Sequence, residues 1–446
     1  MKSITSLLPP GVRPAYPADM SLARPKIAPE FALLFAVMLT IGAGNTALQS
    51  VMPAIGRSLG IADSIIAAAF SASALVWVVA APIWARRSDR TGRRRMVITG
   101  MAGFSVSVLL CGMFLTAGIH RLITPVATIA AFIGARMIYG LFGAAAPPAA
   151  QAILAARTTR AERTKALTLL ASAFGLGTIL GPALASYFVL PGVGLAGPAY
   201  FFAGIGFVVL VLTWRFLPDD RAGDSVHGAV TSYPSIGGNL TGASVTAATA
   251  KRSTEHVALT DSRIWPWMLV GLVMGHAQAM VGQAMAFLVI DRLVLAPTTI
   301  LSQQTIGIVL TSGAGAALLV QWGVIPQLNL KPRAMVLVGL ALASVGCAMI
   351  GLAGSLYTIA MAFALTSAGF GFARPGYTAG SSLAVGPELQ GVVAGRVTSV
   401  NGASFVLGPS IGIGLYQIWQ PLPYLVAAAA CAMLMLYSAR ALKREA

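Results

Sequence analysis

Long apolar runs alternate along this chain with short polar connections. A run of about 20 residues can cross the roughly 30 Å hydrocarbon core of a bilayer as a helix. Open strands cannot satisfy their backbone hydrogen bonds in lipid, so we expect every run to be helical. The sequence therefore predicts an all-α membrane protein with twelve transmembrane helices. The expected ranges are 31–54, 64–84, 96–117, 124–155, 165–188, 198–217, 264–289, 302–325, 334–353, 356–385, 392–417 and 420–439.

One connection is much longer than the others. Residues 218–263 are rich in Gly, Ser, Thr and Ala, a composition typical of a flexible linker. This linker separates six expected helices in residues 31–217 from six in residues 264–439. We expect a six-helix bundle on each side of the linker, with a disordered tail at residues 1–30 and a short tail at residues 440–446.

The two halves share a pattern at a constant offset. Leu180–Ala183 reads Leu-Gly-Pro-Ala, and Leu407–Ser410, 227 residues later, reads Leu-Gly-Pro-Ser. At the same offset Pro148 falls on Pro375. Gly-Pro pairs also recur by chance in membrane helices, but agreement across two helices without a gap indicates duplication. Two pseudo-symmetric bundles are the architecture of alternating-access transporters.

Composition agrees with a location in lipid. The chain is 57% hydrophobic and 10% charged, whereas soluble domains carry about 25% charged residues. The net charge of +17 would suggest nucleic acid for a soluble protein. Here the basic residues lie in the connections, which is the pattern of membrane orientation. We therefore expect the lipid bilayer, and no nucleic acid, as a partner.

The basic residues gather on one side of the expected membrane. The other side holds Arg57, Arg121 and Arg292. Because basic connections stay in the cytoplasm, both termini and the linker are expected there, in a bacterial-type inner membrane. The residues on the basic side are Arg86, Arg87, Arg90, Arg93, Arg94, Arg95, Arg157, Arg160, Arg163, Lys165, Lys331, Arg333, Arg396, Arg440, Lys443 and Arg444.

No enzyme signature stands out in the sequence. Cys111, Cys347 and Cys431 fall inside apolar runs, without CxxC or metal-ligand spacing, and we interpret them as small buried side chains. No Walker loop is present, so ATP is not expected to act directly. We expect no cofactor, no metal and no enzymatic activity.

The connection after the second expected helix carries a specific motif. Residues 88–95 read Ser-Asp-Arg-Thr-Gly-Arg-Arg-Arg. They fit the pattern Gly-x-x-x-Asp-basic-x-Gly-Arg-basic, with Ala85 in place of the first Gly. The matching residues are Asp89, Arg90, Gly92, Arg93 and Arg94. Through this motif, and over nearly its whole length, the chain resembles the major facilitator superfamily.

The resemblance implies a cytoplasmic gate at this motif. Gly92 permits a positive φ in the turn, and the arginines hold it at the headgroups. In the family the acidic residue of this motif meets the start of the eleventh helix. In this chain the eleventh expected helix is 392–417, and its start lies near Gly395 and Arg396. A carboxylate is stabilised at a helix N-terminus, so Asp89 is expected to latch the two halves together. The alternative is that these charges only set topology.

Two further stretches carry the resemblance. Arg136 with Gly140 looks like the family's Arg-x-x-x-Gly stretch, and an arginine this deep should face the interior, for proton coupling or an anion. The alternative is an arginine that snorkels outward. Gly177, Gly181 and Pro182 resemble the Gly-x-x-x-Gly-Pro hinge motif of the exporting antiporters, although Ala185–Ser186 replace its final glycines. Ordinary small-residue packing is the alternative here.

The resemblance also implies a cavity surrounded by helices 1, 4, 7 and 10. An ordinary interhelical hydrogen bond is the alternative role for each polar residue of these helices, His276 above all. The cavity candidates are Asn45, Gln49, Tyr139, His276, Gln283 and Tyr377. Arg374, like Arg136, is expected to be a coupling or anion-attracting residue.

The expected function is export of a small molecule. No acidic residue lies in the middle of an expected span; Asp291, at the outer end of helix 7, is the nearest. Two deep arginines without a buried acid favour an anionic or zwitterionic substrate. We expect a monomeric, proton-coupled secondary exporter of a drug-like compound or an endogenous metabolite such as a metal chelator. The alternatives are an importer of an organic anion and, third, a non-transporting membrane sensor or enzyme.

Overall fold

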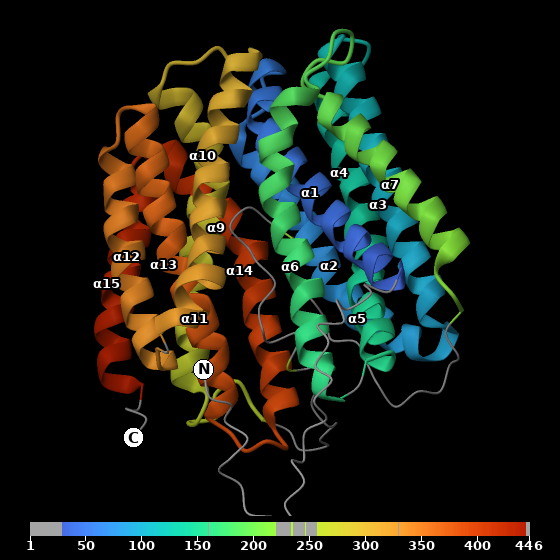
Figure 1. Cartoon of the computed structure of the whole chain (residues 1–446). Coiled ribbons are helices and arrows are strands. Elements are labelled where there is room, and N and C mark those ends of the chain that lie inside the picture. The colour runs from blue at the N-terminus through green and yellow to red at the C-terminus, as the bar shows by residue number, and fades with distance from the viewer. Residues whose placement is uncertain are drawn as a thin grey trace, which may run out of the picture.

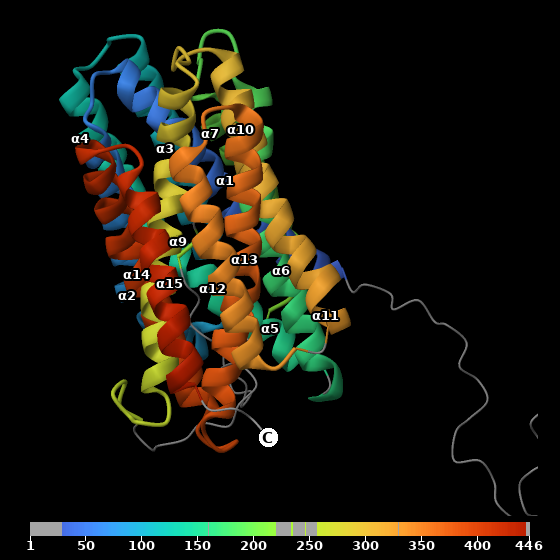
Figure 2. The same ribbon diagram turned by 90° about the vertical axis from the view of Figure 1, so that its left-hand side faces the viewer.

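The structure is a computed structural model that describes residues 29–158, 160–219, 233–234, 246, 257–328 and 330–442. Side chains are described in all these ranges except at positions 89, 90, 160–162, 164 and 165. Long helices, most of them parallel or antiparallel to one another, make up the molecule (Figures 1 and 2).

Each half contributes six spans. The spans of the first half are α1 (Pro29–Ser58), α2 (Asp63–Thr91), α3 (Arg93–Ile119), α4 (Pro125–Phe142) continued by α5 (Ala146–Ala156), α6 (Arg160–Ala185) and α7 (Gly197–Phe216). The spans of the second half are α9 (Trp265–Arg292), α10 (Ile300–Leu318) continued by α11 (Ile325–Leu328), α12 (Pro332–Leu352), α13 (Leu356–Leu383), α14 (Gln390–Ile418) and α15 (Leu422–Ala441).

The predicted fold class is confirmed. Every expected apolar run coincides with one of these spans; the ends agree to within about five residues, except that α2 ends at Thr91 and not at the expected residue 84. Eleven helices of the described ranges are long and apolar enough to cross a membrane, and α14 is the twelfth span, packed along α9 and α2. The tails at residues 1–28 and 443–446 and most of the linker lie outside the described residues, so the expected domain boundaries stay a prediction.

Two of the spans consist of two helices that are joined by a short irregular segment. A 3₁₀ turn at Gly143–Ala145 connects α4 to α5, whose second and third residues are Pro147 and Pro148. Because proline lacks an N–H, it cannot make the normal helical hydrogen bond and favours such a break. A π-helical segment at Leu319–Val324 connects α10 to α11.

The turn between α2 and α3 is tighter than the sequence predicts. The basic residues 88–95 are expected to form a connection, but α2 continues to Thr91 and α3 begins at Arg93. Only Gly92 interrupts the two helices, with a φ of 96° that favours glycine. Charges mark where a helix leaves the hydrocarbon, and a helix can continue beyond that point.

The halves meet toward one end of the bundle. We name this the distal end; it is the upper end in Figure 1, opposite the end where α15 finishes. Here α1 contacts α9, α2 contacts α14 and α6 contacts α10. The Ser71 and Ser410 hydroxyls lie 2.9 Å apart across the α2–α14 contact, and Gly307 of α10 packs on the backbone of Pro182 in α6.

The repeated Gly-Pro pattern packs in the same way in both halves. Gly181 of α6 lies against α1, where an added Cβ would stand 2.3 Å from the Ala43 oxygen. Gly408 of α14 lies against α9, where an added Cβ would stand 2.6 Å from the Ala279 Cβ. The first and fifth spans of each half thus approach through an equivalent glycine, as duplicated bundles should.

Candidate functional site

Arg136 lies in the interior of the first half. It projects from α4 and is fully buried, with its guanidinium 5.0 Å from the Phe70 ring and 4.8 Å from the Tyr139 ring. Its Nη2 donates to the Asn45 side-chain oxygen on α1, and Ser73 of α2 donates to its backbone carbonyl at 3.0 Å. Arg136 therefore faces the other helices of the bundle and not the outer surface.

Two residues of the linker lie against this arginine. Tyr233 is 3% exposed, and its hydroxyl accepts a hydrogen bond from Arg136 Nη2. The carbonyl oxygen of Pro234 accepts hydrogen bonds from the side-chain amides of Asn45 at 2.5 Å and Gln49 at 3.4 Å. The predicted residues Asn45, Gln49 and Arg136 are thus brought together, around a segment that the sequence did not place there.

Aromatic rings enclose the Tyr233 side chain. Its ring meets Trp77 at 5.8 Å and an interplanar angle of 89°, and Tyr139 at 5.9 Å and 65°. Both are edge-on contacts of the kind that aromatic pairs prefer. We call these residues the Arg136 cluster; its members are Asn45, Gln49, Ser73, Trp77, Arg136 and Tyr139.

Arg374 occupies a similar position in the second half. It projects from α13, is 3% exposed, and its Nη2 donates to the side-chain oxygen of Gln278 on α9. Arg374 and Gln278 line a cavity of about 20 Å³, the room that one water molecule needs. Thr178 and Pro182 of α6 form part of the same wall, so this cavity lies between the halves.

Both arginines retain unused hydrogen-bonding capacity. Within the described residues, Nε and Nη1 of each guanidinium are buried without a hydrogen-bond partner, and neither side chain pairs with a carboxylate. The Tyr139 and Tyr377 hydroxyls are buried without a partner as well. Buried cations are costly unless they are paired. Each arginine can therefore accept a group that carries negative charge or several acceptor oxygens.

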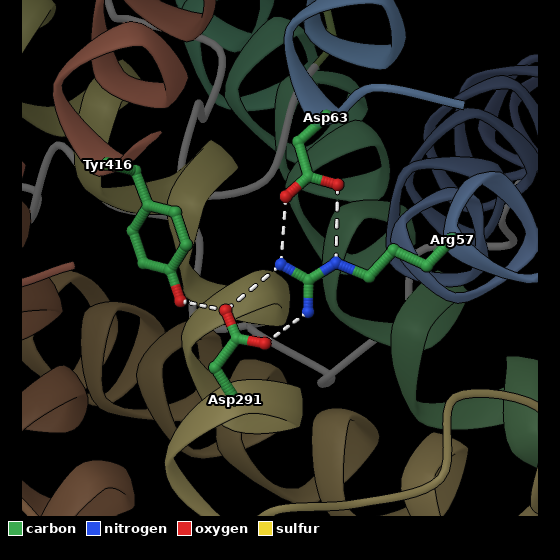
Figure 3. A network of polar contacts seen from close by, with 4 residues as sticks. All are labelled: Arg57, Asp63, Asp291 and Tyr416. Carbon is green, nitrogen blue, oxygen red and sulfur yellow. Dashed lines mark hydrogen bonds and ion pairs between the residues drawn. The ribbon is translucent and has the colours of Figure 1, made fainter. Parts of the chain in front are cut away.

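A second polar network joins the two halves at the distal end (Figure 3). Arg57, in the last turn of α1, donates to Asp63 at the start of α2, with Nη2 and Oδ2 2.8 Å apart. It also donates to Asp291 in the last turn of α9, with Nη2 and Oδ2 3.0 Å apart. The Tyr416 hydroxyl of α14 donates to Asp291 at 2.6 Å.

This distal network was not predicted from the sequence. Asp63 belongs to the same half as Arg57, whereas Asp291 lies 234 residues away in the other half. Sequence reasoning identified Arg57 as an outer arginine and Asp291 as the nearest acid, without pairing them. The six-residue spacing from Arg57 to Asp63 across a tight turn is a signal that could have found the first pair.

The motif between α2 and α3 is only partly described. The side chains of Asp89 and Arg90 lie outside the described ones, so the expected latch against α14 stays a prediction. Arg94 donates to Asp219 at 2.9 Å and to the Trp214 carbonyl, which ties the start of α3 to the end of α7. Arg93 is buried.

The two residues near which the latch is expected lie at the start of α14. Arg396 of α14 donates from Nε to the carbonyl of Val257, in the segment before α9, at 2.9 Å. An added Cβ at Gly395 would meet nothing within 4 Å.

The hinge motif of α6 lies against α1 along its length. Gly177 is packed so closely that an added Cβ would stand 2.4 Å from the Leu39 oxygen, and Gly181 repeats this contact one turn later. Pro182 lies inside α6 and also reaches the cavity beside Arg374.

The remaining candidates lie outside the Arg136 cluster. His276 Nδ1 lies 2.7 Å from the Leu272 carbonyl one turn earlier in its own helix, and Gln283 is half-buried on the same helix. Tyr377 is fully buried against Gly271 of α9. These three are therefore placed in the bundle without a contact to Arg136.

Comparison with known proteins agrees with this architecture. The human organic anion transporter MFSD10 (TETRAN) superposes over 93% of this chain and 100% of its own, with a TM-score of 0.63 and 18% identity. The nucleoside transporter NupG covers the same shares with a TM-score of 0.65 and 9% identity. At these identities the likeness shows the fold alone.

Sequence comparison is more specific but partial. Multidrug resistance protein 2 of Bacillus subtilis (strain 168) is 27% identical over 194 residues, which are 44% of this chain and 44% of that protein. The chain spans less than half the length of the curated relatives it matches. A model of the Major Facilitator Superfamily matches residues 34–326. Because this match covers well over half of its length, the chain belongs to the Major Facilitator Superfamily.

Proposed function

We propose that this protein is a secondary active transporter that exports a small molecule, a drug-like compound or an endogenous metabolite such as a metal chelator. Its partial relatives include multidrug resistance proteins 1 and 2 of Bacillus subtilis (strain 168) and a staphyloferrin B transporter of Staphylococcus aureus, and the multidrug efflux pump LfrA of Mycolicibacterium smegmatis is the relative whose name supports export. Family membership also favours a transporter over an enzyme.

The observation that carries the proposal is the closed distal end. Arg57 of the first half and Asp291 of the second are joined there by an ion pair, next to the contact of Ser71 with Ser410. With both termini on the cytoplasmic side of an inner membrane, as the loop charges favour, the distal end faces outward. This is the state in which an exporter loads its substrate from inside, and in which an importer releases it, so the choice of export rests on the names of the relatives.

The buried arginines support an anionic substrate or one rich in acceptor oxygens. Arg136 and Arg374 have guanidinium nitrogens without partners in the described part of the chain. A carboxylate, or a ring with several acceptor oxygens, would satisfy them. Proton exchange is part of the proposal, and Asp291, which stands between Arg57 and Tyr416, is its candidate carboxylate.

A second candidate function is import of an organic anion by the same fold. The two buried arginines favour an anion without favouring a direction. The direction of solute movement in vesicles of known orientation distinguishes import from export.

The test uses inverted vesicles containing the full chain. A pH gradient is imposed, candidate carboxylates and drug-like cations are added in turn, and lumenal pH and solute uptake are followed. We expect solute-dependent proton release from the lumen, and at least tenfold slower uptake in Arg136→Gln and Arg374→Gln.

The matched control is Arg121→Gln, a distal arginine in the turn after α3. It should transport at the normal rate. Normal uptake by both buried-arginine variants, or uptake that ignores every gradient, would overturn the proposal.

A further inference from the structure

We propose that the Arg136 cluster is a binding site for a phenolic compound with a carbonyl oxygen near its ring, and that Tyr233–Pro234 of the linker holds this site in the absence of substrate. This inference rests on the proposed function in one respect: the bound compound is a substrate only if the protein transports it. Its test, however, measures binding and not transport.

The first argument is the quality of the fit. Tyr233 places a ring between Trp77 and Tyr139 and its hydroxyl against Arg136. The same hydroxyl lies 3.3 Å from the Asn45 oxygen and 3.4 Å from the Ser73 oxygen, both of which can accept its proton. The phenol is thus recognised at its ring and at its hydroxyl, as donor and acceptor.

The second argument is that every protein group around the ring is buried. With Tyr233 in place, Asn45, Ser73, Trp77, Arg136 and Tyr139 are each 0% exposed. Polar groups buried in this way cost free energy unless they have hydrogen-bond partners, so whatever fills the site has to supply those partners. Arg136 Nε and Nη1 and the Tyr139 hydroxyl still lack partners within the described residues, so the linker satisfies the site only in part.

The third argument is the chemistry of the second contact. The Pro234 carbonyl accepts from both Asn45 and Gln49, two amides one helical turn apart on α1. A ligand must therefore supply a carbonyl or carboxylate oxygen there to replace the linker. A carboxylate would also suit the unused guanidinium nitrogens better than a neutral peptide carbonyl does.

The fourth argument is that the occupant comes from the linker. Tyr233 is the single aromatic residue of residues 218–263, and it lies among side chains 94 to 188 positions away. A ligand for the same site has to displace it. The apparent affinity is then reduced by the fraction of molecules in which the linker holds the site.

The test is a binding measurement on the purified full chain. N-acetyl-tyrosine amide carries the phenol and a nearby carbonyl, and N-acetyl-phenylalanine amide lacks only the hydroxyl. Equilibrium dialysis with each labelled probe is compared among wild type, Tyr233→Ala, Tyr233→Phe and Tyr357→Ala. Tyr357 is a control because it is 79% exposed on α13, away from the cluster.

We expect Tyr233→Ala to bind the tyrosine probe about tenfold more tightly than wild type. Tyr233→Phe, which keeps the ring and loses the hydroxyl, should give an intermediate gain, and Tyr357→Ala should give none. The phenylalanine probe should bind at least about tenfold more weakly than the tyrosine probe, because it leaves buried polar groups unpaired.

Two results would overturn the inference. One is equal binding of both probes, which removes the phenol-recognising site. The other is unchanged affinity in Tyr233→Ala that elutes as wild type on size exclusion, which removes the linker as competitor. Either result leaves the vesicle experiment, and with it the proposed transport function, untouched.

Discussion

Asp291→Asn should open the distal end, and Asp63→Asn should not. Both carboxylates accept from the same guanidinium of Arg57, and both side chains are largely shielded, at 22% and 14% exposure. Only Asp291 connects one half to the other, because Asp63 and Arg57 belong to neighbouring helices of the first half. The two variants therefore remove similar charges with different consequences for the closed state.

The magnitude follows from the geometry. A hydrogen bond to a charged group contributes about 1.5–3 kcal/mol, whereas a solvent-exposed ion pair contributes about 0–1 kcal/mol. Arg57 and Asp291 are between these limits, so we expect Asp291→Asn to destabilise the closed end by about 1–2 kcal/mol. This corresponds to a shift of about 5- to 30-fold in the ratio of closed to open molecules.

The assay is a distance measurement between spin labels at the distal end. Cysteines replace Leu122, 76% exposed in the turn after α3, and Leu301, 62% exposed at the start of α10. The native cysteines are buried and can be replaced by serine if they label. Asp291→Asn should increase the long-distance population by this factor, and Asp63→Asn should change it less than about twofold.

Equal shifts in the two variants would refute the reasoning. They would mean that the loss of either carboxylate partner of Arg57 opens the distal end, whether or not that carboxylate connects the two halves. No shift in Asp291→Asn would refute it as well. In the double variant Arg57→Gln, Asp291→Asn, the shift should be no larger than in Asp291→Asn, since both changes remove one interaction.

Three further predictions concern other parts of the chain. Asp89→Asn should insert normally and lower the transport rate about two- to fivefold, from the loss of a carboxylate at a helix N-terminus; normal transport in vesicles would leave residues 88–95 a topological signal. Gly181→Ala should lower the thermal unfolding temperature in detergent, since its Cβ would stand 2.3 Å from the Ala43 oxygen and overpacking costs about 1–3 kcal/mol, whereas Gly134→Ala, with nothing within 4 Å, should not. Hydrogen bonds from Arg263 hold the pKa of Asp261 at about 2, below its ordinary 3.8. The stability that the ionised Asp261 contributes is fully present above its ordinary pKa and is lost only as the pH falls through 2. The dependence of transport rate on pH between 5 and 8 should therefore be the same in Asp261→Asn as in wild type.

The helices could be predicted from the sequence because lipid imposes a strict rule on length and polarity. Apolar runs located all twelve spans, and the Gly-Pro repeat indicated the duplicated packing of α6 on α1 and α14 on α9. Depth within the span placed Arg136 and Arg374 in the interior, because a charged side chain is costly elsewhere.

Contacts between distant segments could not be predicted in this way. Arg57 and Asp291 each lie at the end of a span, where a charge is inexpensive, so neither position required a partner. Tyr233 belongs to a segment whose composition is typical of flexible chain, and composition says nothing about one residue bound by distant side chains. A lone aromatic followed by proline in such a linker was the available signal.

The one-residue turn at Gly92 has a mechanical consequence. A connection of this length contains no slack, so α2 and α3 cannot slide along each other independently. The helix α3 also packs along α7, and Arg94 at its start contacts Asp219 and the Trp214 carbonyl at the end of α7. We therefore expect a displacement of α2 against α14 to carry α3 and α7 with it, so that these three helices move as one lever.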